Sequence, residues 1–300
     1  MVAKNKITKP LLAIVGTTAT GKSQLALKLA AKFSGEIVSA DSWVVRRGLD
    51  IGTAKPSLKD RQTVRHHMID IIEPDDNFSA AEYKKRAAAA IEGIYSRNHL
   101  PIIVGGSGLY VDSLLFDYSF LPASGRGERE RLNALPLQDL QLLALDEELD
   151  LDSIDKNNKR RVIRLIETNG GIATRTSLRD STLIIGLNPE RKELTKSITK
   201  RVDQMLAQGL EGEVKNLSEE YGWGCEALKG IGYHEWRLYF TSNQDLTTTR
   251  ERIIKDTLDL AKRQQSWFKR NKSIHWFTTP VNLSQVDALI TTFLSKNVSV

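Results

Sequence analysis

A glycine-rich loop near the start of the chain has the residue types and spacing that bind phosphate. It follows the apolar run 11–15, precedes the helix-forming segment 24–30, and reads Gly16-Thr17-Thr18-Ala19-Thr20-Gly21-Lys22-Ser23. In such loops, backbone N–H groups at the positive end of the next helix surround an anion. Lys22 adds a charge for the terminal phosphates, and the Ser23 hydroxyl is suited to Mg²⁺. The loop therefore predicts binding of a diphosphate or triphosphate, including nucleotides such as ATP, rather than a merely tight turn.

Two more polar stretches follow apolar runs that are typical of buried strands. Asp41 comes directly after 36–40, and ligands of open α/β sheets bind at the carboxyl ends of the strands. We therefore expect Asp41 to face the ligand of the loop, although it or Ser42 could instead cap a helix that begins at 43. The run 101–104 leads into a glycine turn around Ser107, whose amides and hydroxyl could hold a second ligand.

These stretches belong to a chain whose composition is that of a globular protein. Its 300 residues, of which 40% are apolar, suffice for one main domain with an elaboration. Lys and Arg number 43 against 37 Asp and Glu, so the net charge of +6 favours a polyanionic partner. The single cysteine, Cys225, excludes an internal disulfide and a CxxC zinc site and suggests the cytoplasm. The apolar run 11–16 is too short to span a membrane, so we expect no membrane-spanning segment.

Short apolar runs alternate with helix-like segments, which predicts an α/β fold: a P-loop parallel-sheet core covered by helices. We expect strands at 11–16, 36–40, 68–72, 101–104, 183–187 and 274–277. We expect helices near 22–33, 79–97, 108–116, 190–208, 211–220, 232–240 and 247–270. The charged stretch 123–180 has no clear strand before 182 and predicts a small helical insertion domain. The core would then comprise 1–122 and a mostly helical completion at 181–300.

Taken together, the motifs resemble those of the tRNA dimethylallyltransferases, also called tRNA isopentenyltransferases. That family shows the phosphate loop, an Asp-Ser stretch that runs into Asp-Ile-Gly-Thr-Ala-Lys-Pro (here 41–56), and a Gly-Gly-Thr-x-Leu-Tyr turn (here 105–110). Further matching segments are 66–70, 160–167, 201–206, 230–233 and 261–268. The resemblance runs from about 11 to 277 with its motifs in order. Thr17 stands where the family has proline, Ser107 where it has threonine and Arg46 where it has tyrosine. No Cys/His zinc finger follows the core, as in the bacterial form.

The resemblance implies a reaction. The loop would bind the diphosphate of dimethylallyl diphosphate, and the exocyclic N6 amine of an adenosine adjacent to the anticodon of tRNA would attack the allylic carbon. Lys22, Arg201, the loop amides and Mg²⁺ at Ser23 would neutralise the leaving diphosphate. Because the lone pair of the amine is delocalised into the adenine ring, Asp41 would accept its proton. The adenosine would have to leave the anticodon-loop stack.

The resemblance also implies a tRNA-binding set that contacts the anticodon stem-loop. Its members are Asp41, Ser42, Trp43, Val44, Ser107, Arg129, Arg160, Arg161, Val162, Ile163, Arg164, Lys229, Gly230, Ile231, Gly232, Tyr233 and His234. The arginines at 160, 161 and 164 share one helix face, which by spacing alone is more typical of a solvated basic surface. His66 and His67 lack a carboxylate or thiolate at ligand spacing and are expected to be structural. We expect the protein to act as a monomer in the cytoplasm.

Two other function classes remain open from the residues alone. A small-molecule or nucleoside kinase would share the loop, the sheet and the ligand edge, and the insertion could be its lid. A non-catalytic RNA-binding regulator would explain the basic charge but would leave the loop and Asp41 without a role.

Overall fold

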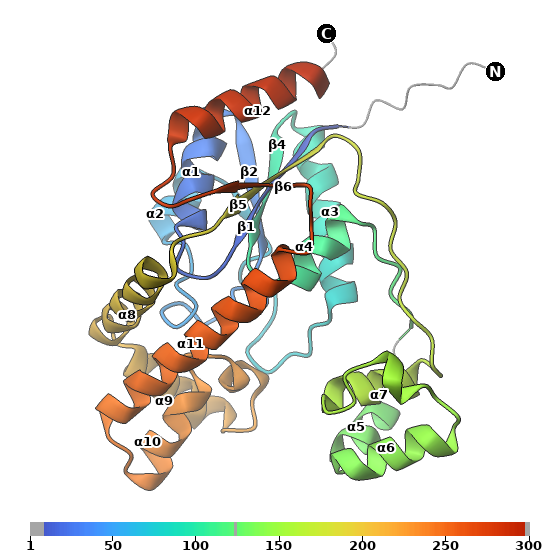
Figure 1. Cartoon of the computed structure of the whole chain (residues 1–300). Helices are drawn as coiled ribbons and strands as arrows, with labels where there is room; N and C mark the ends of the chain where they lie inside the picture. Colours follow the sequence, from blue (N-terminus) through green and yellow to red (C-terminus); the bar gives the residue numbers. More distant parts are fainter. Residues whose placement is uncertain (1–8, 123–124, 298–300) are drawn as a thin grey trace, which may run out of the picture. The chain divides into compact units, whose positions relative to one another are not determined.

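A computed structural model describes residues 9–122 and 125–297 and divides into two compact units (Figure 1). The sheet unit contains the chain up to Leu115 and again from Leu178, and the insertion unit is Phe116–Ser177. In the part of the chain that is described, no helix has the length and apolar character needed to cross a membrane.

The sheet unit is built on six parallel strands in the order β3-β2-β4-β1-β5-β6. They are β1 (Leu11–Gly16), β2 (Gly35–Ala40), β3 (His66–His67), β4 (Leu100–Gly105), β5 (Thr182–Leu187) and β6 (Ile274–Phe277). The strand sequences are largely continuous apolar runs, because helices cover both faces of the sheet. Gly105 is in register with both Ala40 and Val15, so the loops after β1, β2 and β4 meet at one edge. This edge is the one at which a ligand is expected.

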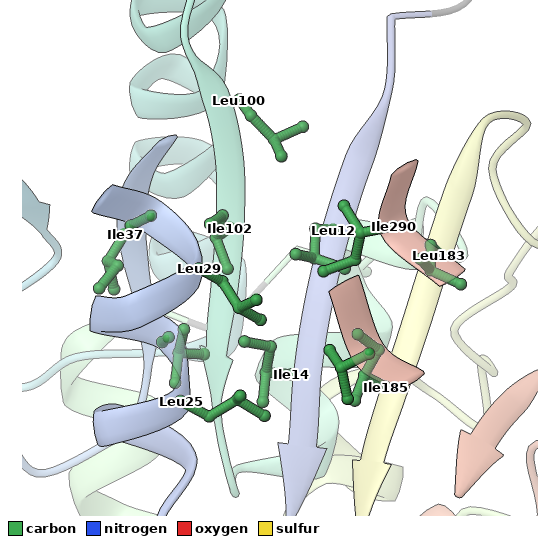
Figure 2. Packing of buried hydrophobic residues seen from close by; sticks show 14 of the residues in the cluster. Leu12, Ile14, Leu25, Leu29, Ile37, Leu100, Ile102, Leu183, Ile185 and Ile290 are labelled. Carbon is green, nitrogen blue, oxygen red and sulfur yellow. The ribbon is translucent and has the colours of Figure 1, made fainter. Parts of the chain in front are cut away.

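Helices of the sheet unit cover the two faces of the sheet. The helices described in this unit are α1 (Lys22–Lys32), α2 (Leu58–Thr63), α3 (Ala80–Ser96), α4 (Gly108–Leu115), α8 (Arg191–Ala207), α9 (Leu210–Tyr221), α10 (Arg237–Ser242), α11 (Leu246–Phe268) and α12 (Leu283–Asn297), with 3₁₀ turns η2 (Glu226–Lys229) and η3 (His234–Trp236). Of these, α9 and α10 pack with η2 and η3 in a second core and do not cover the sheet. Figure 2 shows the core on one face, where Leu25 and Leu29 of α1 and Ile290 of α12 pack on Ile14 and Ile185. This core fixes α1, and with it the loop that precedes α1.

The insertion unit is helical and has its own small core. It contains α5 (Arg126–Ala134), α6 (Leu137–Asp146), η1 (Leu151–Ser153) and α7 (Lys159–Glu167). Leu132, Leu140 and Ile163, one from each α-helix, are fully buried in this core. Glu167, whose side chain is 1% exposed, pairs there with Arg129 and Arg164. Buried charges require such partners, so these two arginines stabilise the unit.

Two local predictions were wrong, one alternative does not occur, and two helices were missed. The strand expected at 68–72 is replaced by the two-residue β3, because Met68 and Asp70 have φ of 63° and 55°. Asp70 accepts hydrogen bonds from Lys55 and Arg61, at 2.6 Å each, and these ion pairs outweigh the apolar pattern. The helix expected at 232–240 is divided into η3 and α10. The possible helix at 43 is a series of turns, and α2 and α12 were not predicted.

A buried carboxylate ties β2 to its neighbours. Glu36, 2% exposed, accepts hydrogen bonds from Arg97 at 2.7 and 2.8 Å, and it pairs with His67 Nε2 at 2.6 Å and His99 Nδ1 at 2.8 Å. The Arg97 hydrogen bonds, followed by those of the histidines, outweigh desolvation and lower the pKa of Glu36 to about 2. His67 therefore has a structural role, as expected.

We predict that Glu36→Gln lowers the free energy of unfolding by about 3 kcal/mol at pH 7, because a neutral amide loses the charge-assisted hydrogen bonds that the buried carboxylate accepts from Arg97. The folded-state pKa of Glu36 lies below the unfolded value of 4.5. Its contribution is therefore complete above pH 4.5 and is lost as the pH falls toward 2. Urea unfolding of wild type and variant at pH 7 and at pH 3 measures both effects.

The matched control is Glu82→Gln, which removes an exposed pair with Arg86 on α3. This substitution should change stability by less than about 0.5 kcal/mol. If Glu36→Gln is no more destabilising than this control, the Glu36 network does not stabilise the sheet.

Candidate active site

The expected phosphate loop, residues 16–23, is a compact turn between β1 and α1. Gly16 has φ of +142°, and a Cβ there would lie 2.6 Å from the carbonyl oxygen of Leu187, so glycine is required. Gly21, with φ of +83°, is the N-cap of α1. Within the loop, Thr20 Oγ1 and Lys22 Nζ both donate to the Thr17 carbonyl, at 2.8 and 2.5 Å. The loop is thus closed on itself at the positive end of α1.

A cavity of about 100 Å³ opens beside the loop, entirely within the sheet unit. Its lining brings together Thr18, Lys22 and Ser23 of the loop, Asp41 after β2, Thr53 and Ala54, Gly105 and Gly106 after β4, Arg201 of α8 and Gln264 of α11. Six segments that are distant in sequence therefore meet at the carboxyl edge of the sheet. The three residues expected to be catalytic, Asp41, Lys22 and Arg201, all line this cavity.

Two cations and one carboxylate dominate the charge of the cavity. Burial, and then the neighbouring Arg201, lower the pKa of Lys22 to about 7, while Asp41 opposes this shift. Burial also lowers the pKa of Arg201, again against the effect of Asp41. Arg201 is held by hydrogen bonds to Thr18 Oγ1 at 3.2 Å and the Thr53 carbonyl at 3.0 Å. An excess of positive charge in a desolvated site favours an anionic ligand.

Asp41 stabilises a turn rather than a helix. Its Oδ1 accepts the Trp43 amide at 2.8 Å, and its hydrogen bonds in the described chain engage this oxygen alone. The neighbouring Ser42 amide donates to Ser107 Oγ at 3.1 Å, and the Ser107 amide donates to the Ala40 carbonyl at 3.1 Å. The turns after β2 and β4 are thereby joined. Asp41 is held in place with one carboxylate oxygen available to another donor.

The residues expected to bind tRNA at 41–44 and 229–234, and the neighbouring Arg46, lie in different environments. Lys229 and His234 are exposed, whereas Tyr233 is 1% exposed and donates to Glu213 Oε1 at 2.7 Å. Val44 is buried, and the Trp43 ring packs against Gly230. Arg46 is also buried and donates to the carbonyls of 74 and 76 at 2.8 and 2.7 Å. These carbonyl dipoles stabilise the buried charge of Arg46.

The residues of the insertion unit that are expected to bind tRNA also differ in their exposure to solvent. Arg160 and Arg161 are exposed, but Val162 and Ile163 are fully buried, so the side chains of the latter two do not face a ligand. Besides its contact with Glu167, Arg164 donates to the carbonyl of Leu121 at 2.5 Å. The contiguous segment 160–164 thus contains both surface and core positions.

Two residues near the cavity were missed. Gln264 Oε1 accepts the amide of Thr18 at 2.8 Å, and Glu213 of α9 accepts the amides of residues 50, 51 and 52 at 2.8 to 3.0 Å. Gln264 lies in the recognised segment 261–268, but nothing in its spacing relates it to the loop 246 residues earlier. Glu213 carries no local signal, because its partners are adjacent only in the folded chain.

Sequence comparisons with known proteins agree with one another. The sequence model described as IPP transferase matches residues 44–271. A curated tRNA dimethylallyltransferase of Pelotomaculum thermopropionicum is 40% identical over 291 residues, which cover 92% of each chain. A relative of the same name from Staphylococcus epidermidis is 38% identical and covers 98% of this chain and 95% of its own.

Solved structures of similar fold have related names. The tRNA isopentenylpyrophosphate transferase of Bacillus halodurans has a TM-score of 0.73 at 34% identity, with 97% of both chains covered. A eukaryotic dimethylallyltransferase acting on tRNA has a TM-score of 0.81 at 26% identity, with 96% of this chain and 80% of its own covered.

The low pKa of Lys22 leads to a prediction for diphosphate binding. Because that pKa is about 7, Lys22 loses its charge as the pH rises above 7 in the ligand-free protein. Relative to Lys22→Arg, whose guanidinium stays charged, the wild-type affinity should fall by up to about tenfold per pH unit above pH 7. Calorimetry with inorganic diphosphate at pH 6.5, 7.5 and 8.5 measures this ratio. The ionisation of the diphosphate affects both proteins equally and therefore cancels in this ratio of affinities. A ratio that does not change with pH would contradict the prediction.

Proposed function

The chain belongs to the IPP transferase family of tRNA dimethylallyltransferases, and on this premise we propose how its site carries out the reaction. A dimethylallyl group passes from dimethylallyl diphosphate to the exocyclic N6 amine of an adenosine adjacent to the anticodon in tRNA, and diphosphate leaves. The observation that carries the proposal is the meeting of Lys22, Arg201 and Asp41 in one cavity beside the phosphate loop.

The leaving diphosphate takes up negative charge as its bond to the allylic carbon breaks. Lys22, Arg201 and the loop amides are held in position before the ligand arrives, by the hydrogen bonds to Thr17, Thr18 and Thr53. Preorganised cations in a desolvated site stabilise such charge without reorganising during the reaction. We assign the diphosphate to residues 16–23 on this basis.

The amine needs a group that accepts its proton. As the bond between N6 and the allylic carbon forms, an N–H proton of the amine is transferred to Asp41. The carboxylate oxygen that accepts no hydrogen bond within the described residues supports this role, because it can accept the proton.

The residues present also fit Mg²⁺, an ion that prefers oxygen ligands. Ser23 and Asp41 line the same cavity and offer a hydroxyl and carboxylate oxygens. We assign Mg²⁺ to Ser23, where the bound ion would neutralise charge on the diphosphate.

For tRNA, exposure is the basis for choosing among the expected residues. Arg160, Arg161 and Lys229 present exposed side chains that can meet phosphates. We assign these three to direct contact, and Arg129 and Arg164 to the internal support of the insertion unit. His234, whose Nδ1 lies 3.0 Å from the Gly230 carbonyl oxygen, is left out of the direct contacts. Ser107, half-buried beside Ser42, and the backbone of Gly230 to Gly232 remain in the tRNA-binding set.

Substrate use tests the whole proposal. The protein is incubated with dimethylallyl diphosphate and unmodified tRNA, and separately with ATP and candidate acceptors. Prenylated adenosine in the first reaction is the expected result. Phosphoryl transfer in the second, with no prenylation in the first, would favour a kinase, which the relatives do not support.

Replacing the proposed base gives a second prediction. Asp41→Asn keeps an acceptor for the Trp43 amide, so the melting temperature should be unchanged. The rate of the chemical step should fall by roughly 10²–10⁴-fold, because the amide no longer accepts a proton. Single-turnover prenylation with both substrates saturating isolates this step. A loss of less than about threefold would remove Asp41 from the mechanism.

The exposed arginines of α7 give a third prediction. The double substitution Arg160→Ala and Arg161→Ala should weaken tRNA binding by about tenfold and flatten its salt dependence between 50 and 200 mM, since two phosphate contacts are lost. Arg131→Ala is the control, because Arg131 is exposed in the same unit but pairs with Glu128. Equal effects of the two changes on the salt slope would argue against a specific tRNA contact at α7.

A further inference from the structure

His234, Glu235 and Asp256 bring three potential metal ligands together outside the phosphate cavity. His234 and Glu235 belong to η3, and Asp256 belongs to α11. One atom from each residue can be chosen so that all three lie within 4.8 Å of one another. His234 Nε2 is 3.3 Å from Asp256 Oδ2, and His234 Nδ1 is 3.5 Å from Glu235 Oε2.

The hydrogen bond of the imidazole determines which nitrogen can bind an ion. His234 Nδ1 lies 3.0 Å from the carbonyl oxygen of Gly230. A carbonyl can only accept, so Nδ1 carries the proton and the lone pair of the neutral ring is on Nε2. Nε2 then faces the Asp256 carboxylate, which is also an acceptor. A positive species, either a second proton or a metal ion, must lie between them. A backbone carbonyl on the far nitrogen is a usual arrangement for metal-binding histidines.

Glu235 is the second, independent indication of a cation. Its side chain is 1% exposed. Oε2 accepts the amide of Gly232 at 2.9 Å, but Oε1 is buried and has no hydrogen-bond partner in the described residues. A buried carboxylate with an unsatisfied oxygen costs free energy unless a cation or a proton is bound.

The geometry and the donor types favour a particular class of ion. Two ligand atoms that are each about 2.1 Å from Zn²⁺, with an angle of about 90–109° at the ion, lie about 3.0–3.4 Å from each other. The distance of 3.3 Å between His234 Nε2 and Asp256 Oδ2 falls within this range. One imidazole nitrogen with two carboxylates suits Zn²⁺, Mn²⁺ or Co²⁺, whereas Mg²⁺ prefers oxygen alone. We propose that His234, Glu235 and Asp256 form a binding site for a divalent first-row transition-metal ion, separate from the Mg²⁺ position at Ser23.

Such an ion would join two elements that border the proposed active site. η3 follows the turn at 229–233, whose Tyr233 packs against Gly52, and α11 carries Gln264 to the phosphate loop. The side chains of His234 and Asp256 are 45% and 36% exposed, so the ion has a path from solvent and room for water ligands. The ion would act as a cross-link between η3 and α11 and would hold this turn in place.

Metal titration tests the site without either substrate. The full chain is treated with EDTA, exchanged into chelator-free buffer and titrated with ZnCl₂ by calorimetry. We expect one site per chain, with an affinity reduced by at least about tenfold in His234→Ala and in Asp256→Asn. His275→Ala, which removes an exposed histidine on β6, is the control and should bind as wild type. Both ligand substitutions are at partly exposed positions and should leave the fold intact.

Two further readouts separate a metal from a proton. Co²⁺ should give a visible absorption spectrum in wild type and in His275→Ala but not in His234→Ala. Saturating Zn²⁺ should raise the melting temperature of wild type by about 2–4 °C and should leave that of Asp256→Asn unchanged. Absence of Zn²⁺ binding to wild type, or binding to both His234→Ala and Asp256→Asn with the affinity of wild type, would overturn the proposal. Since no tRNA or prenyl donor is present, failure here does not affect the proposed prenyl transfer.

Discussion

The site depends on keeping two cations together in a cavity with little water. Lys22 and Arg201 repel each other, and burial disfavours the charge of both. They stay in place because the Thr17 and Thr53 carbonyls accept their hydrogen bonds and because Asp41 lies close enough to oppose the shifts in their pKa values. Such an arrangement is unfavourable alone and becomes favourable when a polyanion enters. The rest of the sheet unit serves to hold these groups at fixed positions, which the register of β1, β2 and β4 provides.

The predictable part of the structure is the part governed by local patterns. β1, β4 and β5 are apolar runs of strand length, and the loop after β1 is recognisable from its glycines and Lys22. Asp41 could be placed at the cavity because parallel strands end at a common edge. The failures occur where distant groups decide the backbone. The strand expected at 68–72 is broken by ion pairs of Asp70 with Lys55 and Arg61, and neither partner is recognisable from the strand itself.

For the residues expected to bind tRNA, the family pattern names whole segments and does not separate buried side chains from exposed ones. The segment 160–164 is contiguous in the family pattern, but a helix turns successive residues to different sides. Val162 and Ile163 consequently form the core of the insertion unit while Arg160 and Arg161 remain on its surface. Arg46 replaces a tyrosine of the family, and only its contacts with the carbonyls of 74 and 76 reveal that its charge is satisfied internally. Gln264 and Glu213 act through backbone amides, which no residue pattern records.

The central strand β1 has consequences for how the protein is made on the ribosome. β1 is synthesised first, but one of its two neighbours, β5, follows the insertion unit. Arg201 and Gln264, which complete the cavity, are made later still, and Val286 and Ile290 of α12, which cover one face of the core, follow them. The phosphate loop therefore emerges long before its supporting contacts exist. A nascent chain arrested before α11 lacks the Gln264 contact with Thr18, so the complete cavity forms only after most of the chain has been translated.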